Sequence, residues 1–253
     1  MDGTIEQKRL RELALRAAHT GRPQFTRFLE PSMFSEVRAA ANACGVRCAF
    51  SGGYDGAERM MAAFFDGDAP DPSEYPMHTV CIEWNPKFAS PAHRDLLGAV
   101  MGTGIERDAV GDIAMGIRRE KPCAWLFAAE EMADYIAASL ESAGRAAVKA
   151  HLTDEPPEIL PPEGEHLRVT VQNERLDALL AAGQRLSRSE AQRLVAAGLV
   201  KLNHVPCLRP DARVSEGDLI SARGYGRLRV EAFMGESRRG RLVVALFRYG
   251  APR

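Results

Sequence analysis

Apolar positions along the chain switch between a spacing of about 3.6 residues and a spacing of two, so the sequence predicts both helices and strands. Helical spacing is clear in residues 4–19 and 32–44. Ser32 is suited to cap the second of these helices, and Gly45 to end it. The segment VRCAFSGGY (46–54) then predicts a short strand that finishes at two glycines.

The middle of the chain shows a regular order of elements. HTVCIEW (78–84) has the character of a strand, and PAHRDLLGAVMG (91–102) that of a helix capped by Ser90. AVGDIAMG and PCAWLFA predict an antiparallel pair, AEEMADYIAASLESAG a helix that ends at Gly144, and RAAVKAHL a last strand. This βαββαβ order is that of a ferredoxin-like, or RRM-like, sheet. The fold class is therefore α+β.

The segment TDEPPEILPPEGEH (153–166) interrupts the apolar pattern. Its four prolines, one glycine and several acids are typical of a stiff, solvated connection. We therefore divide the chain as follows: an N-terminal helical layer with a short strand (1–75), a ferredoxin-like domain (76–152), a proline-rich linker (153–170) and a C-terminal domain (171–253).

The formal charge of −1 conceals opposite charges in two parts of the chain. Residues 174–253 hold 15 Lys and Arg against 8 Asp and Glu, a net charge of +7. The other residues hold 18 against 26, a net charge of −8. Arginine predominates in the basic part, and its planar guanidinium suits phosphates and base planes. A polyanionic partner is indicated, with a merely solvated basic face as the alternative.

Several classes of function find no support in the sequence. No apolar run reaches the roughly 18 residues that span a bilayer, and the N-terminus predicts a charged helix instead of a signal peptide. The five cysteines form no C-x-x-C pair, so neither a zinc site nor a disulfide framework is predicted and a reducing cytoplasm is expected. Glycine-rich nucleotide-binding loops do not occur, and the six histidines form no spacing motif. We expect a cytoplasmic monomer without membrane, metal or cofactor.

Residues 175–203, RLDALLAAGQRLSRSEAQRLVAAGLVKLN, predict two short helices followed by a strand. The first helix should end at Gly183, and the second should begin with a capping box formed by Ser187 and Glu190. A helix N-terminus presents unpaired N–H groups and a positive dipole end, which attract phosphate. Lys201 alternates with apolar neighbours and so leaves the strand away from the core. Four cations are expected to line one face: Arg185, Arg188, Arg193 and Lys201.

The same residues, followed by GDLISARGYG, resemble an S4 RNA-binding domain, the αL-type module of a small-subunit ribosomal protein. The likeness covers roughly residues 174–230, with RLD, SRS, VKLN and EGD in the expected order. The resemblance implies this RNA-facing set: Arg175, Arg185, Ser187, Arg188, Ser189, Arg193, Lys201, Asn203 and Arg223.

The triplet Arg175-Leu176-Asp177 has a second interpretation. Pseudouridine synthases use the aspartate of an Arg-Leu-Asp to attack uridine. Here the triplet opens a leucine-spaced helix, and only about 75 residues follow, too few for a synthase catalytic domain. We therefore expect Asp177 to cap or pair within the module, and we assign no catalytic residue. An RNA-modifying enzyme with an S4 targeting module is the alternative.

Two more segments extend the resemblance. SGGYDGAERM (51–60) and NPKFASPAHRDLLGAVMGTGIERDAVGDI (85–113) are similar to the motifs G-G-Y-x-x-A-E-R and K-F-x-x-x-x-H-R-D-x-L-G-A of the YlmH-type family of S4-domain proteins. This resemblance implies a non-enzymatic protein that binds structured RNA, namely rRNA of the large ribosomal subunit, tRNA or both. A role in ribosome-associated quality control of stalled subunits is also implied. An adaptor whose acidic body binds a protein partner is a further possibility.

The motif His93-Arg94-Asp95 cannot act as a catalytic trio, because adjacent helical residues point about 100° apart. In one interpretation, Arg94 or Asp95 pairs with Arg107 or Asp112 and fixes the fold. In the other, a second RNA patch would increase effective concentration through the linker. That patch would consist of Lys87, His93, Arg94 and Arg107. Tyr54, beside the paired glycines, is either a base-stacking residue or part of the core.

Overall fold

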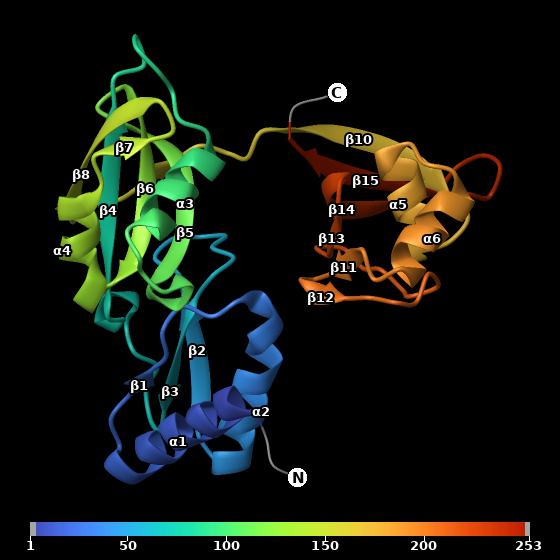
Figure 1. The fold of residues 1–253 in the computed structure, drawn as a ribbon. Helices are drawn as coiled ribbons and strands as arrows, with labels where there is room; N and C mark the ends of the chain where they lie inside the picture. Colours follow the sequence, from blue (N-terminus) through green and yellow to red (C-terminus); the bar gives the residue numbers. More distant parts are fainter. Residues whose placement is uncertain (1–3, 251–253) are drawn as a thin grey trace. The chain divides into compact units, whose positions relative to one another are not determined.

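The computed structural model describes residues 4–250, which fall into two compact units, Met1–Leu160 and Pro161–Arg253 (Figure 1). The predicted linker, 153–170, is largely β structure instead. It contains the two-residue strand β9 (Glu158–Ile159), which pairs with the preceding sheet, and most of β10 (Gly164–Val171). The prolines on either side of β9 are tolerated because β9 lies at the edge of its sheet, where a missing N–H breaks no ladder.

Unit 1 begins with two helices on a small sheet. α1 (Ile5–Thr20) starts at Thr4, which forms a reciprocal capping box with Gln7, and ends at Gly21 in the left-handed conformation. α2 (Phe34–Cys44) follows a 3₁₀ turn, η1 (Pro31–Met33). Ser32 therefore lies within this turn and does not cap α2, contrary to the prediction.

The small sheet has the order β1 (Gln24–Phe25), β3 (Met61–Phe65), β2 (Arg47–Ser51). β3 is buried along its whole length, which explains its continuous run of apolar residues. One core joins the two helices to this sheet through Leu10, Ala14, Val37, Ala41 and Phe64.

The rest of unit 1 has the predicted ferredoxin-like order. Its elements are β4 (Met77–Trp84), α3 (His93–Gly102), β5 (Val110–Arg118), β6 (Lys121–Ala129), α4 (Glu130–Ser139) and β8 (Ala146–Thr153). The strands pair antiparallel in the order β8-β4-β6-β5, with the short strands β7 (Ser142–Ala143) and β9 at the edges. The core of this sheet includes Val80, Ile82, Leu96, Trp125 and Phe127.

Two predicted helix ends in this part are wrong. α3 is capped from within, since the Asp95 carboxylate accepts the Ala92 N–H at 3.0 Å, and Ser90 lies outside the helix. α4 ends at Leu140, while Gly144 forms the β7–β8 turn with φ of 59°. A serine before proline and a glycine after a helix are local signals, and here a competing cap and a hairpin turn override them.

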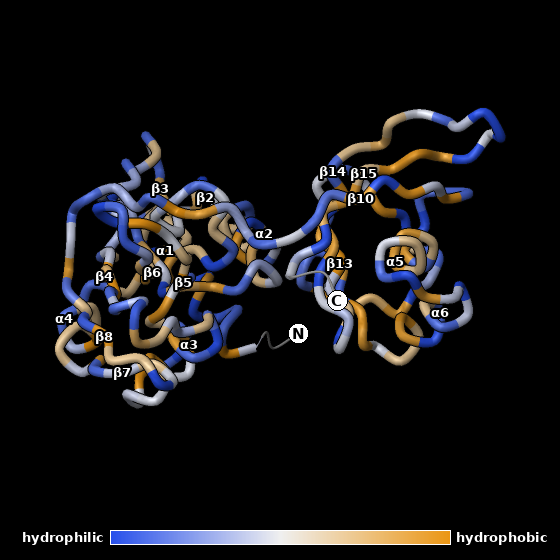
Figure 2. Tube along the Cα trace, turned by 90° about the horizontal axis from the view of Figure 1, so that it is seen from above, coloured by the Kyte–Doolittle hydropathy of each residue, from blue (hydrophilic) through white to orange (hydrophobic). Residues whose placement is uncertain are grey.

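Unit 2 is a six-stranded antiparallel sheet with two helices. Its elements are β10, α5 (Leu176–Gln184), α6 (Arg188–Ala196), β11 (Val200–Leu202), β12 (Val205–Pro206), β13 (Leu219–Ala222), β14 (Gly226–Glu236) and β15 (Leu242–Tyr249). The strands lie in the order β10-β15-β14-β13-β11-β12. Both helices lie on one side of the sheet (Figures 1 and 2), with a common core of Leu176, Leu179, Val195, Leu228 and Leu246.

The turn between α5 and α6 differs from its prediction. Gly183 does not end α5 but lies inside it, where a Cβ would come within 2.5 Å of the Leu228 side chain. Arg185 ends the helix instead, in the left-handed conformation with φ of 56°. Glycine at 183 thus serves close packing of the helix on β14, and the strained turn position carries an arginine.

Candidate nucleic-acid interface

A buried carboxylate organises the two helices of unit 2. Asp177, in the first turn of α5, is fully buried. Arg175 donates to both carboxylate oxygens at 3.2 and 3.1 Å. From α6, Arg188 donates to Oδ1 at 2.7 Å and Gln192 to Oδ2 at 2.9 Å. Asp177 therefore pairs within the module, as predicted.

The two arginines bound to Asp177 still reach solvent. Their side chains keep 37% of their surface exposed at Arg175 and 41% at Arg188. Burial alone would raise the pKa of Asp177, but hydrogen bonds from Arg175, Gln192 and Arg188 outweigh it and hold the pKa below its usual value. The carboxylate is thus ionised at neutral pH and holds both guanidinium groups in fixed positions at the protein surface.

Only one of the two hydrogen bonds of the predicted capping box forms at the N-terminus of α6. Ser187 Oγ accepts the Glu190 N–H at 3.2 Å and lies 3.1 Å from Ser189 Oγ. Glu190 does not return a bond to Ser187; its carboxylate accepts the Tyr225 hydroxyl at 3.0 Å. The capping box is therefore half formed, and Glu190 instead connects α6 to the β13–β14 turn.

A shallow hollow of about 580 Å³ lies beside α6. Three members of the predicted RNA-facing set line it, namely Arg175, Ser189 and Arg193. Gln192, which the sequence analysis missed, also lines it; its spacing of four residues from Arg188 could have indicated a common helix face. The remaining lining residues are Ala196, Pro210 and Asp211. Arg185 is also exposed, at the start of the turn into α6.

The structure separates two predicted residues from this face. Lys201 lies on β11 between Val200 and Leu202, which pack in the core with the helices, so its side chain leaves the opposite side of the sheet. Asn203, at φ of 49°, donates to Asp218 at 2.7 Å and accepts the Leu219 N–H at 2.9 Å. Asn203 therefore fixes a turn instead of facing a ligand.

Arg223 remains a candidate for RNA contact. Its side chain is exposed in the turn after β13, and its backbone N–H donates to the Leu199 carbonyl at 2.9 Å. This bond ties the turn that carries Arg223 to the segment just after α6. The helix face and this turn are thus joined through the backbone.

One residue of the predicted second patch in unit 1, Arg107, is engaged by the fold. Lys87, His93 and Arg94 are exposed near the start of α3, but Arg107 follows its end, and a 10-residue helix spans roughly 15 Å. The Arg107 guanidinium donates to the carbonyls of Val110 and Gly111. Burial, and then the neighbouring Arg59, lower the pKa of Arg107. Arg107 therefore belongs to the fold, and the other three residues stay a prediction.

The predicted pairing of Arg94 or Asp95 with Arg107 or Asp112 is also wrong. Arg94 is 90% exposed and its charged contact is the adjacent Asp95, at 3.7 Å. The Asp112 carboxylate instead accepts the Tyr54 hydroxyl at 3.1 Å and the Glu58 N–H at 2.6 Å. Asp112 therefore binds the loop of unit 1 that contains Tyr54 and Glu58.

That loop, SGGYDGAER, is a structural element. Tyr54 stacks on Phe127 with ring centroids 4.9 Å apart, and Gly53, at φ of 88°, leaves no room for a Cβ against the same ring. Burial, and then Asp112, raise the pKa of Tyr54 well above its ordinary value. Tyr54 is thus part of the core, which agrees with the second of its two interpretations.

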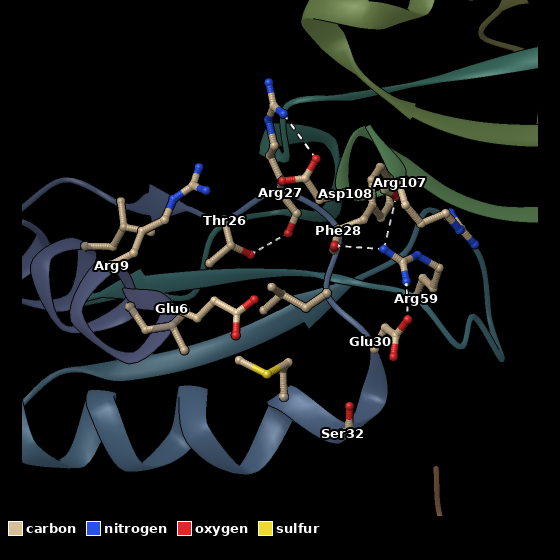
Figure 3. A pocket seen from close by; sticks show the side chains of 14 residues that line it. Glu6, Arg9, Thr26, Arg27, Phe28, Glu30, Ser32, Arg59, Arg107 and Asp108 are labelled. Atoms are coloured by element: carbon tan, nitrogen blue, oxygen red, sulfur yellow. Dashed lines mark hydrogen bonds and ion pairs between the residues drawn. The ribbon is translucent and has the colours of Figure 1, made fainter. Parts of the chain in front are cut away.

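Arg59 ends the loop and is buried. Its guanidinium donates to the carbonyls of Val110, Phe28 and Arg107, and contacts the Glu30 carboxylate at 3.4 Å (Figure 3). It lies in the wall of a cavity of about 350 Å³ beside α1. Burial lowers the pKa of Arg59, and Glu30 and Asp112 counteract this effect.

Neither a metal site nor a membrane-spanning helix is found within residues 4–250. Within residues 4–250, no three His, Cys, Asp or Glu side chains gather in a way that could hold a metal ion. Over the same residues, none of the helices combines the length and apolar character needed to cross a membrane.

Comparison with known proteins agrees with the two-part architecture. Residues 174–220 match the family model "S4 domain", and residues 70–155 match "Putative RNA-binding domain in YlmH". The chain is 36% identical over 229 residues to "Ribosome-associated protein quality control protein P2" of Bacillus subtilis (strain 168), which covers 90% of this chain and 88% of that protein. A solved structure, "Cell division protein ylmH from Streptococcus pneumoniae", is 22% identical, with a TM-score of 0.46 over 60% of this chain and 94% of that one.

The α5–α6 unit with its clamped arginines, together with the S4 match, defines the class: this is an S4-domain protein that also carries a ferredoxin-like domain. The full-length relative and the second family model narrow the class further. The chain belongs to the YlmH-type family of S4-domain proteins.

Proposed function

We propose that the protein is a ribosome-associated factor that grips structured RNA with the α5–α6 face of unit 2. The observation that carries the proposal is the Asp177 clamp, which holds Arg175 and Arg188 half-exposed, with Arg175 lining the same hollow as Arg193. Guanidinium groups held in place lose little conformational freedom on binding phosphates, so the face is preorganised for an RNA backbone. The capped N-terminus of α6 adds exposed N–H groups to it.

The relative's name, with its reference to the ribosome and to protein quality control, supports the biological setting of this proposal. The target we favour is rRNA of the large subunit, tRNA or both, in the handling of stalled subunits. S4 domains on this reading recognise shape and phosphate positions more than base edges. The protein would act as a monomer and without chemistry of its own.

A pseudouridine-synthase-like enzyme is the competing function, and the environment of Asp177 disfavours it. A nucleophilic aspartate must reach the uridine, yet both oxygens of Asp177 are buried and occupied by Arg175, Arg188 and Gln192. Attack would require the clamp to open and both arginines to lose their partner.

The test is sedimentation of the protein with purified ribosomal subunits at low and high salt. We expect the protein to migrate with the large subunit, less so at high salt, because each neutralised phosphate releases counterions. Arg193→Glu should abolish migration, since Arg193 is exposed and lines the hollow beside α6. Arg16→Glu, a charge reversal on exposed α1, is the matched control.

Two results would contradict the proposal. Normal migration of Arg193→Glu would mean that the face is wrong. Failure of the wild-type protein to migrate with either subunit, followed by failure to bind free tRNA, would remove the ribosomal setting.

A further inference from the structure

The sheet of unit 2 has a second face that no helix of residues 161–250 covers. Core side chains such as Val200, Leu228 and Leu246 point toward α5 and α6. Because successive side chains of a strand point to opposite sides, their neighbours point the other way. We call this second side the outer sheet face and define it by six residues: His166, Lys201, Arg227, Arg229, Phe247 and Tyr249.

Pairing between strands brings these six residues together. Lys201 faces Ser221, which in turn faces Arg227 on β14. On the next row, Arg229 faces Phe247, which faces His166 on β10. Adjacent strands lie about 4.8 Å apart, so the six side chains form one continuous surface.

The aromatic rings of the outer sheet face contact one another and a guanidinium. The Arg227 guanidinium lies 4.7 Å above the Tyr249 ring centroid. Tyr249 meets Phe247 edge-on at 4.9 Å, and Phe247 meets His166 at 5.1 Å. The Phe247 ring also covers Gly164, where a Cβ would come within 2.5 Å of it. The rings are thereby held in position on the sheet.

The charge of this surface is positive. Lys201, Arg229 and the adjacent Arg168 are exposed, and the nearby acid, Glu231, is paired with His166 at 3.0 Å. The β14–β15 hairpin extends this charge: its turn, SRRGR (237–241), holds three exposed arginines, and its tip is strongly hydrophilic in Figure 2.

Rings and guanidinium planes next to cations are the chemistry that recognises unpaired nucleotides. Bases stack on aromatic rings and on arginine planes, and the backbone phosphates pair with the cations. Bases inside a duplex cannot stack in this way, because their own neighbours already cover their faces. A sheet with stacking aromatics is also how RRM domains hold single-stranded RNA.

We propose that the outer sheet face binds single-stranded RNA and is a site separate from the α5–α6 face. Most of it lies outside both matched segments, since β10, β14 and β15 fall beyond residues 70–155 and 174–220. The inference goes beyond the proposed function: one side of unit 2 grips folded RNA by its phosphates, and the other holds an unpaired stretch by its bases. Lys201 would then contact RNA on the outer sheet face instead of on the predicted face with Arg185, Arg188 and Arg193.

The experiment compares two fluorescent RNAs on the full chain, an oligouridine of about 12 nucleotides and a fully paired hairpin with a short loop. Tyr249→Leu keeps apolar bulk but removes the stacking ring, and it should weaken oligouridine binding about tenfold. Lys201→Gln, at an exposed position with no part in the core, should weaken it less and lower the salt slope by about 0.7. Both variants should bind the hairpin within about twofold of wild type.

Arg193→Glu serves as the reciprocal variant, because it should weaken hairpin binding and spare oligouridine. Thermal unfolding of Tyr249→Leu shows whether that variant is folded, and Lys201→Gln carries the test if it is not. Equal oligouridine affinity in wild type and in folded Tyr249→Leu and Lys201→Gln overturns the inference, as does an absence of oligouridine binding in wild type. Hairpin binding that persists in either case leaves the proposed function intact.

Discussion

Each unit of this protein contains an acid–arginine network around a buried charge, Arg59 in unit 1 and Asp177 in unit 2, and these two networks are built in opposite ways. In unit 1 the arginine is buried: Arg59 has 10% of its side chain exposed and donates mainly to backbone carbonyls. In unit 2 the acid is buried, and the arginines that bind Asp177 reach the surface. The first network closes a loop onto a sheet. The second holds two guanidinium groups at the surface, where we propose that they contact RNA.

The difference shows that acid–arginine pairs in two motifs can have different roles, one within the fold and one at the surface. Asp112 and Arg59 bind groups of their own chain, and Arg59 is buried, so a ligand would have to displace fold contacts to reach them. Arg175 and Arg188 have spent only part of their hydrogen-bonding capacity, because a guanidinium carries five N–H donors. The second arrangement therefore leaves N–H donors at the surface for the proposed contact with RNA.

The largest effect on stability should come from breaking the Arg59 network of unit 1. Arg59→Met would leave the carbonyls of Val110, Phe28 and Arg107 without their donor, at a cost of about 3–5 kcal/mol in the free energy of unfolding of unit 1. Urea unfolding followed by tryptophan fluorescence reports on this unit alone, since Trp84 and Trp125 are the two tryptophans of the chain.

The control for that substitution is Arg94→Met, at a 90% exposed position on α3, which should change the free energy of unfolding by less than about 0.5 kcal/mol. Equal effects of the two substitutions would show that the Arg59 network does not hold the loop.

Breaking the Asp177 network of unit 2 should lower the stability somewhat less. It should lower the RNA affinity more. Asp177→Asn keeps the volume of the side chain and removes the charge that Arg175 and Arg188 bind, which should destabilise unit 2 by about 2–3 kcal/mol. Hydrogen exchange of the α5 and α6 amides measures this loss locally. Glu163→Gln, at an exposed acid of the same unit outside the hollow, is the control. A folded Asp177→Asn with wild-type RNA affinity would break the proposed link between clamp and binding.

Acid should reproduce the Asp177 substitution without a mutation. The pKa of Asp177 is lower in the folded than in the unfolded chain, so its contribution to stability is complete above its ordinary pKa of about 4 and is lost as the pH falls through the lowered value. The free energy of unfolding of unit 2 should therefore fall more steeply below about pH 4 in wild type than in Asp177→Asn. Parallel pH profiles would mean that the carboxylate is not ionised in the fold.

The smallest effects should come from the helix caps, where the two units are alike. Thr4 caps α1 and Ser187 caps α6 through the same side-chain-to-backbone bond. Alanine at either position should cost about 1 kcal/mol in its own unit. A much larger loss at Ser187 would indicate that its cap also supports the Asp177 clamp, and so would sharpen the contrast between the networks.

Periodic patterns in the sequence predicted the elements well, because a period depends on many residues. The ferredoxin-like order and the two helices of unit 2 follow from such runs. Single-residue signals failed more often: Ser32 lies inside a 3₁₀ turn, Asp95 caps α3 in place of Ser90, and Gly183 lies within α5 where it packs against Leu228. β10 was hidden because its alternation of Leu167, Val169 and Val171 follows directly on the proline-rich segment.

The site was predictable only in part, for the same reason. Helical spacing could place Arg188 and Gln192 on one face of α6, since they lie four residues apart on one helix. It could not show that the Asn203 amide forms hydrogen bonds within a turn. Nor could it show which side of the sheet the helices cover, and hence to which side Lys201 points. Those facts depend on contacts between elements that are distant in sequence.

The left-handed Arg185 at the end of α5 has a consequence for anyone who would engineer this protein. Glycine adopts that conformation without a steric penalty, so Arg185→Gly is the substitution that a search for thermal stability would choose, with an expected gain of about 1 kcal/mol. The same exchange deletes an exposed positive charge at the entrance to α6. An optimisation that rewards melting temperature alone would therefore select against RNA affinity at this position, and both properties should be screened together.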